Sequence, residues 1–140
     1  MPLNNFDSLC DRYQRIIVSK DKGTSCKHIA NNTCVAYVTH YKIDGCVITQ
    51  GIRCDFLLIN EETKIAYLIE LKGSDLIKAT QQLENTEKVL HQQLSQYQIM
   101  YRIVMRKSST HAIHSSAFRN FQLKKKDRLM FRNNVLEENI

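Results

Sequence analysis

Hydrophobic positions near the start of the chain recur at helical spacing. Within residues 6–18 the apolar side chains lie three or four positions apart, which places them on one face and predicts an amphipathic first helix. The polar residues 20–32 that follow contain Gly23 and are expected to form a loop. The apolar positions of the expected helix are Phe6, Leu9, Cys10, Tyr13, Ile16 and Ile17.

The next segment has a composition that is typical of strands. Residues 34–43, CVAYVTHYKI, are rich in β-branched and aromatic side chains. They lead into Asp44-Gly45, a dipeptide that favours a tight hairpin turn. Residues 46–60 are then expected to form one long strand, bent or bulged at Gly51.

A polar turn separates this strand from the most apolar one in the chain. Residues 60–64, NEETK, are expected to form the turn, and residues 65–73 the strand after it. Residues 65–69, IAYLI, are apolar at every position. Such a segment is typical of a central strand that is covered on both faces.

The remaining pattern alternates between helix and strand. Ser74 or Asp75 is suited to cap a helix, and residues 97–105 are expected to form a fourth strand after it. A helix over 114–126 and a last strand over 127–133 follow. The leucine-rich stripe of the first of these helices consists of Leu76, Ile77, Leu83, Leu90 and Leu94.

The expected order of elements is therefore αβββαβ, followed by a basic tail region. A helix between the third and fourth strands is the usual connection between parallel strands, so we expect an α/β fold with a mixed central sheet flanked by helices. With 140 residues, of which 43% are hydrophobic, the chain fits one domain over 1–140 and has enough apolar side chains for a core.

Charge and cysteine content narrow the expected partners and location. The chain has 20 basic and 14 acidic residues, and its net charge of +6 favours polyanions, with nucleic acid ahead of an acidic membrane. Its five cysteines form no C-x-x-C pair, which is typical of free thiols in a reducing compartment. We find no apolar signal segment and no membrane-length apolar run, so we expect a cytoplasmic protein without a membrane partner.

Two ionisable residues interrupt the most apolar strand. Glu70 and Lys72 are two positions apart in LIELKG, and the two-residue period of a strand places both on one face. Folding the chain about the NEETK turn puts Asp55 opposite Ile69 or Glu70. Two carboxylates that lie so close repel each other, and a divalent cation relieves that repulsion.

Ligands that consist of oxygen alone favour Mg²⁺, which Mn²⁺ can replace, over zinc. Such an ion binds a phosphate oxygen, lowers the pKa of a water and stabilises charge on a transferring phosphoryl group. Lys72 is then suited to orient or deprotonate the attacking water, or to neutralise the phosphate. The alternative for Glu70 and Lys72 is a solvent-facing salt bridge at the end of a strand.

Asp55, fourteen intervening residues and then Glu70-Leu71-Lys72 resemble the PD-(D/E)XK nuclease superfamily, which includes restriction endonucleases and Holliday-junction resolvases. The αβββαβ order is similar to the core of that family, so the resemblance covers residues 6–106. It implies Mg²⁺-dependent hydrolysis of phosphodiester bonds, with the two acids as metal ligands and the lysine at the attacking water. Cys54 stands where the family pattern has a proline, a position that varies.

The resemblance also suggests accessory residues. The family often adds an acid from the first helix, for which Asp7 and Asp11 are both available. Some members place a polar site residue in the helix after the lysine, where Gln81 and Gln82 lie, and a solvated helix face is the alternative. Asp44 is a further accessory candidate, although an Asp-Gly turn explains it without any chemistry.

Basic residues gather late in the chain and suggest a surface for phosphate. The expected nucleic-acid-binding residues are Lys124, Lys125, Lys126 and Arg128, joined by Arg102, Arg106, Lys107 and Arg132, and the alternative is a solvated face. DNA is expected as the substrate ahead of RNA, and a homodimer is expected because cutting both strands needs two centres. The competing function is a catalytically inactive module of the same fold that binds nucleic acid or a protein partner.

Overall fold

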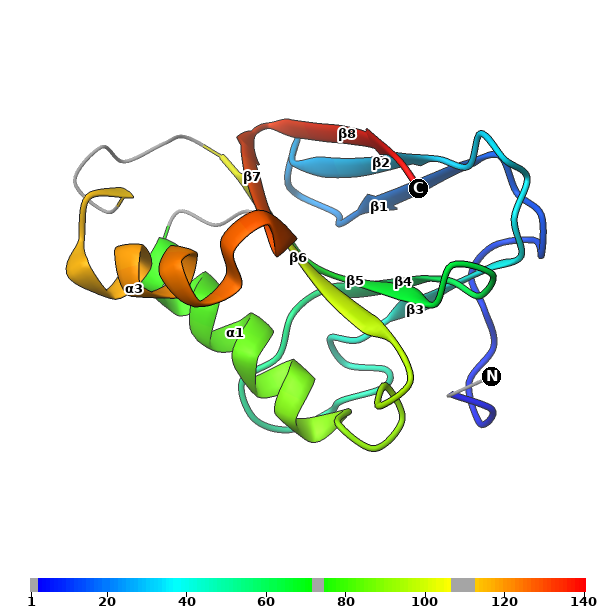
Figure 1. The fold of residues 1–140 in the computed structure, drawn as a ribbon, viewed down its shortest axis with the longest axis horizontal. Helices are drawn as coiled ribbons and strands as arrows, with labels where there is room; N and C mark the ends of the chain where they lie inside the picture. The colour runs from blue at the N-terminus through cyan, green and yellow to red at the C-terminus, as the bar shows by residue number, and fades with distance from the viewer. Residues whose placement is uncertain (1–2, 72–74, 107–112) are drawn as a thin grey trace.

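The computed structural model describes residues 3–71, 75–106 and 113–140, which fold into three layers (Figure 1). A five-stranded sheet forms the middle layer, a three-stranded sheet covers one of its faces, and helices α1 and α3 cover the other. The elements in chain order are β1 (Ile16–Lys20), β2 (Lys27–Asn31), β3 (Val38–Lys42), β4 (Phe56–Asn60), β5 (Ile65–Leu71), α1 (Leu76–Val89), β6 (Gln98–Met105), α3 (Ser116–Lys125), η1 (Lys126–Arg128), β7 (Leu129–Asn133) and β8 (Val135–Asn139).

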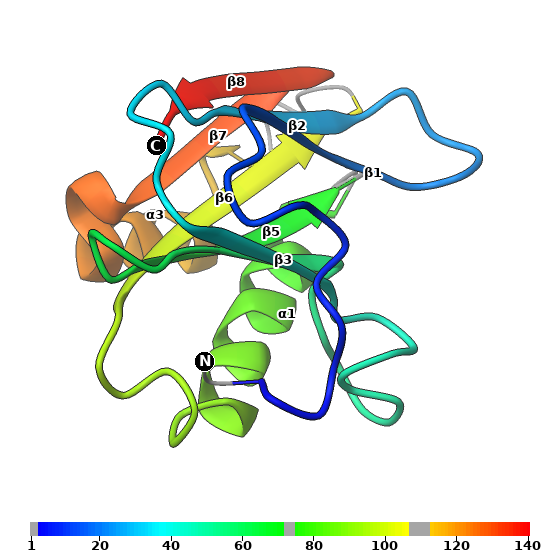
Figure 2. The same ribbon diagram turned by 90° about the vertical axis from the view of Figure 1, so that its right-hand side faces the viewer.

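The middle sheet has the order β3-β4-β5-β6-β7. Strands β3, β4 and β5 form an antiparallel meander, and α1 and α3 are the crossovers that make β6 and β7 parallel to β5. This confirms the predicted parallel pair and the α/β class with mixed sheets. Figure 2 shows β7 running on into β8, which joins the small sheet β1-β2-β8.

The central meander follows the predicted register. Phe56 pairs with Ile69 across the β4–β5 turn, so Asp55, the residue before β4, lies opposite Glu70. The turn itself lies at residues 61–64, as predicted. Asp75 caps α1 by accepting a hydrogen bond from Lys78 N at 3.0 Å.

Two hydrophobic cores lie on either side of the middle sheet. In β4, Leu57 and Ile59 pack toward the helices, whereas Phe56 and Leu58 pack toward the small sheet. The strands of the meander are therefore covered on both faces, as their apolar runs predicted. Each fully buried side chain of this kind contributes about 1.5–3 kcal/mol to the free energy of folding.

The predicted first helix is wrong. Residues 6–15, all of which the structure describes, form turns, bends and irregular backbone, and the side chains of Leu9 and Tyr13 are 59% and 55% exposed. The last part of the segment is the strand β1, which buries Ile17 and Ser19 at alternate positions. A two-residue period, set by pairing with β2, thus replaces the helical one.

The loop predicted over 20–32 contains a strand. Residues 27–31 form β2, whose buried positions are His28 and Ala30. Because one of the two inward positions is a histidine, the sequence of β2 does not show the alternation of apolar and polar residues that predicts a strand. Its burial is possible because His28 Nε2 lies 2.7 Å from Glu138 Oε2 on β8.

The hairpin predicted at Asp44-Gly45 and the long strand after it are also wrong. Residues 43–55 form a loop that contains a bridge between Asp44 and Ile48, and the predicted strand is shortened to β4. Gly45 has a φ of 80°, so the turn is real. It leads back to Ile48 within the loop, however, and β3 pairs with β4 instead.

Arg102, which we expected on a phosphate-binding surface, is buried at 5% exposure. Its guanidinium donates to both carboxylate oxygens of Glu138, at 2.7 and 3.0 Å, and lies over the Tyr67 ring. This bidentate pair ties β6 of the middle sheet to β8 of the small sheet.

Other expectations about the elements and the cysteines hold in most details. Helix α1 buries Leu76 and Leu83 but ends at Val89, and Ile77 is 40% exposed rather than part of the stripe. All five cysteines are free, as predicted. None of the described helices has the length and apolar character needed to cross a membrane.

Candidate functional site

Asp55 and Glu70 lie beside each other at the end of the β4–β5 pair. Asp55 N donates to Ile69 O at 3.1 Å, and Asp55 Oδ2 accepts from Leu71 N at 2.8 Å. These bonds extend the strand pairing by one residue and hold the Asp55 carboxylate against β5. Glu70 is two residues after Leu68 in β5, so both side chains lie on the face of the sheet that the helices cover.

Both carboxyl groups are buried, with exposures of 4% for Asp55 and 5% for Glu70. Burial raises the pKa of Asp55 to about 6, against the opposing bond from Leu71 N. Burial raises the pKa of Glu70 still further, and the negative charge of Asp55 adds to that shift. The charge of Asp55 therefore disfavours that of Glu70, whereas a hydrogen bond from Glu70 favours the charged form of Asp55. Two ionised carboxylates at this distance would repel each other, and a shared cation would relieve that repulsion.

Glu70 presents an oxygen that suits a metal ligand. Its Oε1 atom is buried and has no hydrogen-bond partner in the described part of the chain. A buried acceptor left unpaired lowers stability, and a cation beside it would remove that cost. The oxygen donors of Asp55 and Glu70 fit Mg²⁺ or Mn²⁺.

The described residues contain no group of three His, Cys, Asp or Glu side chains that would surround a metal on their own. Mg²⁺ typically takes one or two carboxylates and completes its octahedron with waters and substrate phosphates. The pair Asp55 and Glu70 therefore matches the number of protein ligands that this ion takes at phosphate-handling sites.

Asp21 is an acid near this pair that our reading of the sequence missed. It is the first residue after β1, and its negative charge helps to raise the pKa of both Asp55 and Glu70. Its Oδ1 atom lies 3.5 Å from Lys42 Nζ at the end of β3. The polar sequence around Asp21 predicts a loop and gives no sign of a functional site. The loop lies beside Asp55 and Glu70 only because β1 is a strand, and we had predicted a helix there.

The additional site acid that we predicted from a first helix, Asp7 or Asp11, is not in a helix. Asp7 and Asp11 are exposed and lie in the non-helical segment before β1. The carboxylates whose charges raise the pKa of Glu70 are Asp55, Asp44 and Asp21.

The two accessory candidates have structural partners. Asp44 accepts a hydrogen bond from Arg53 Nε at 2.8 Å, so its charge is balanced locally although it still raises the pKa of Glu70. Gln82 Nε2 donates to Arg53 O at 3.2 Å and ties α1 to the loop before β4. Gln81 is exposed on α1.

Lys72 lies outside the described residues, as does Ser74, the alternative cap of α1. That Lys72 shares a face with Glu70 therefore stays a prediction from the two-residue spacing. Its role at the attacking water stays a prediction as well.

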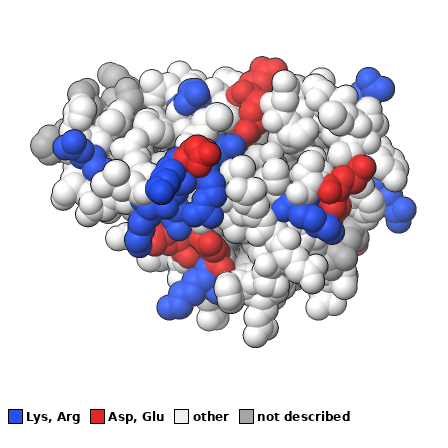
Figure 3. Space-filling view, in the orientation of Figure 1, with Lys and Arg blue, Asp and Glu red and all other residues white. Residues whose placement is uncertain are grey.

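The basic residues near the end of α3 are partly neutralised. Lys125 Nζ lies 3.7 Å from Glu87 and 4.6 Å from the centre of the Tyr101 ring, and its side chain is 13% exposed. Lys124 Nζ lies 3.9 Å from Glu84. Figure 3 shows basic and acidic side chains side by side on this face of the molecule. Part of the charge that we expected to bind phosphate is therefore balanced by α1.

The other members of this predicted surface are more varied. Arg128 lies over the Tyr101 ring at 5.6 Å, whereas Lys126 and Arg132 are exposed. Lys107 lies outside the described residues. Binding of nucleic acid at this surface stays a prediction.

Comparisons of the chain with protein-family models, with curated proteins and with solved structures find no match. The function of this site therefore has to be inferred from its own residues: two buried carboxylates at the end of a hairpin, suited to hold a hard divalent cation.

Proposed function

We propose that this chain is a divalent-metal-dependent nuclease that hydrolyses phosphodiester bonds, with Asp55 and Glu70 holding Mg²⁺ or Mn²⁺ and Lys72 assisting the attacking water. The observation that carries the proposal is Glu70 Oε1, a buried carboxylate oxygen without a partner among the described residues, beside a second buried carboxylate. Two buried carboxyl groups side by side lower stability unless a ligand uses them.

The roles of the residues follow from their positions. A bound Mg²⁺ would polarise the phosphodiester and lower the pKa of a water. Asp55 is held in one orientation by the hydrogen bond from Leu71 N, and Glu70 is held by its place in β5. Lys72, two residues after Glu70, would act on the attacking water or on the phosphate beyond the ion.

The fold supports this proposal at the level of topology. The meander β3-β4-β5, the crossover α1 and the parallel strand β6 supply the βββαβ part of the expected αβββαβ order. The β1–β2 hairpin takes the part of the chain where a first helix was expected. We propose DNA ahead of RNA as the substrate, and a homodimer as the form that cuts both strands of a duplex.

The direct test is cleavage of labelled duplex, single-stranded and branched DNA and of RNA, with Mg²⁺, Mn²⁺ or EDTA. We expect products with either metal and none with EDTA. Lys72→Ala should remove most cleavage but keep the rise in Tm that Mn²⁺ causes, whereas Glu70→Ala should remove both. Lys88→Ala, which removes an exposed charge from the last turn of α1, is the control and should change neither.

The competing function gives a different result. A binding module of the same fold would retain nucleic acid, but it would show no cleavage with any metal and no change of Tm with Mn²⁺. That combination would replace the nuclease proposal.

A further inference from the structure

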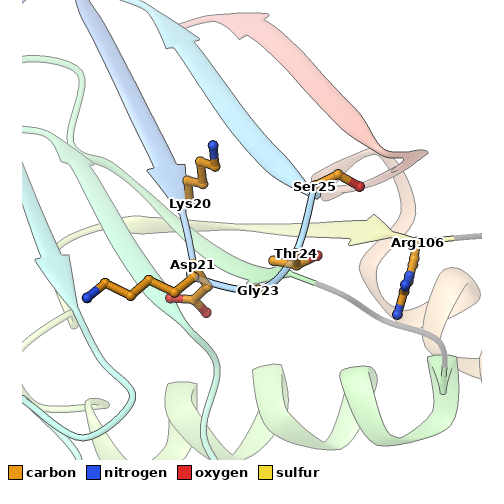
Figure 4. A pocket seen from close by; sticks show the side chains of 7 residues that line it. Lys20, Asp21, Gly23, Thr24, Ser25 and Arg106 are labelled. Carbon is orange, nitrogen blue, oxygen red and sulfur yellow. The ribbon is translucent and has the colours of Figure 1, made fainter.

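A hollow of about 760 Å³ lies beside the turn between β1 and β2 (Figure 4). Residues 21–26 form the turn, and Arg106, directly after β6, stands across from it. Strand β6 runs parallel to β5 with Ile103 beside Glu70, so Arg106 follows β6 at the same end of the strands as the acid pair. The residues that carry the argument are Lys20, Asp21, Lys22, Thr24, Ser25 and Arg106.

Three cationic side chains and one acid line this hollow, and within the described part of the chain the cations are not held in ion pairs. Lys20, Lys22 and Arg106 are exposed, and none of them forms an ion pair with a described residue. The acid in the wall, Asp21, is paired with Lys42 instead. By contrast, Arg102 and Lys125 elsewhere in the chain are paired with glutamates. Unpaired cations around a hollow favour an anionic ligand.

The turn also offers hydroxyl donors. Thr24 Oγ1 accepts a hydrogen bond from Cys26 N at 3.1 Å, so its own proton remains available to a ligand. Ser25 presents a second hydroxyl from an exposed position. Hydroxyls, ammonium groups and a guanidinium are the side-chain donors that proteins use on the phosphates of nucleic acids.

Asp21 connects this hollow to the acid pair. It lines the hollow, and its charge is felt by both Asp55 and Glu70. A phosphate in the hollow would therefore lie next to the site where those acids hold a metal. The phosphates of one strand follow each other closely, so a strand that enters the metal site must place a neighbouring phosphate nearby.

We propose that Lys20, Lys22, Thr24, Ser25 and Arg106 bind successive backbone phosphates of a nucleic-acid strand, next to the phosphodiester that is cut at Asp55 and Glu70. This inference rests on the proposed function for the position of the cut, and it adds the residues that hold the strand. The β1–β2 turn is then a wall of the substrate site, and Asp21 stands between the bound phosphate and the metal.

The test is equilibrium binding of a labelled oligonucleotide in EDTA, so that neither metal nor cleavage contributes. Lys20→Ala and Arg106→Ala should each weaken binding roughly tenfold, and each should reduce the slope of log Kd against log salt by about one, because one phosphate contact is lost. Arg106→Lys should keep the slope but lose part of the affinity, since a lysine lacks the planar fork.

Lys88→Ala is the matched control, because it removes one exposed positive charge near the far end of α1. It should leave affinity and slope nearly unchanged. Equal losses in all three alanine variants, or no loss in any, would overturn the assignment of the hollow. Equally tight binding of polyglutamate, with the same dependence on Arg106, would overturn the assignment to nucleic acid.

Cleavage kinetics separate this inference from the proposed function. If the wild type cuts nucleic acid, Arg106→Ala should raise KM with little change in kcat, and an unchanged KM would reject the phosphate site while the nuclease stands. If the wild type neither cuts nor responds to Mn²⁺, the nuclease proposal fails. The loss of affinity in EDTA then still shows whether the hollow binds phosphate, but its position next to a cut is rejected.

Discussion

At the scale of single residues, the burial of Glu70 lowers the stability of the metal-free protein at neutral pH. Its carboxyl group is 5% exposed, its Oε1 atom lacks a partner among the described residues, and its pKa is raised by burial and by Asp55. A carboxyl whose pKa is raised by folding stabilises the protein least at high pH. The contribution is fully present below the unfolded pKa and is lost as the pH rises toward the folded one.

Glu70→Gln should therefore stabilise the metal-free protein at neutral pH, by about 2 kcal/mol, because the wild-type glutamate has to take up a proton on folding, whereas an amide of the same shape is neutral in both states. The gain should shrink as the pH falls through 4.5, because below this pH the glutamate of the wild type becomes neutral in both states. Thermal melts across this pH range, with and without Mn²⁺, would measure it.

The same substitution should abolish the rise in Tm with Mn²⁺. If Glu70 instead serves only as half of a structural ion pair, the glutamine variant should lose about 3–5 kcal/mol at neutral pH. The two explanations thus predict opposite signs.

At the scale of elements, the two sheets meet through a buried polar contact. His40 on β3 is 3% exposed, lies 2.9 Å through Nε2 from Ser19 Oγ on β1, and stacks on Phe56. Burial, with a smaller effect of His28, lowers the pKa of His40 to about 4. The neutral ring is therefore the form that the folded protein holds.

Acid should weaken this contact. The folded pKa is below the unfolded value of 6.5, so the stabilisation is complete above pH 6.5 and declines as the pH falls toward 4. The stability difference between the wild type and His40→Gln should shrink by up to about 3 kcal/mol across this window. Urea unfolding at several pH values would measure it, and the exposed His91→Gln should show no such trend. A constant difference for His40→Gln would contradict the buried neutral ring.

The elements also show which parts of the fold could be predicted from sequence. The β4–β5 hairpin was predicted with its register, because a short polar turn between two apolar runs leaves one way to pair them. The position of Asp55 opposite Glu70 follows from this register alone. Helices α1 and α3 and strand β6 could also be predicted, since their periodic segments are long and their ends carry caps or turns.

The first third of the chain could not be predicted in this way. Strands β1 and β2 have five residues each, and they bury Ser19 and His28 at inward positions. These polar groups are satisfied by His40 and Glu138, which are distant in sequence, so no local pattern reports their burial. The error in β1 and β2 is also the reason that Asp21 was missed.

At the scale of the whole molecule, one buried cluster joins the layers. Glu138 on β8 accepts from Arg102 of the middle sheet and contacts His28 of the small sheet. Removing the carboxylate would leave the guanidinium buried without a counter-charge.

Glu138→Gln should therefore destabilise the protein by about 3–5 kcal/mol in chemical denaturation. The neighbouring Glu137→Gln is the matched control, because Glu137 is exposed and bonds only the side chain of Asn31 among the described residues. It should change stability by less than about 0.5 kcal/mol. Similar effects of both substitutions would mean that the cluster does not hold the layers together.

The parallel pairing of β2 with β8 has a consequence for the order in which the chain folds. His28 and Glu138 are 110 positions apart, whereas β4 and β5 are joined by a four-residue turn. Closing a long loop costs more entropy than closing a short one, and contacts of this range slow folding. During synthesis the hairpin that holds Asp55 and Glu70 would form early, and the β1–β2 turn would reach its final place only after β8 is made. A molecule that lacks β8 would therefore have the Asp55–Glu70 hairpin in place before the turn that lines the proposed phosphate site.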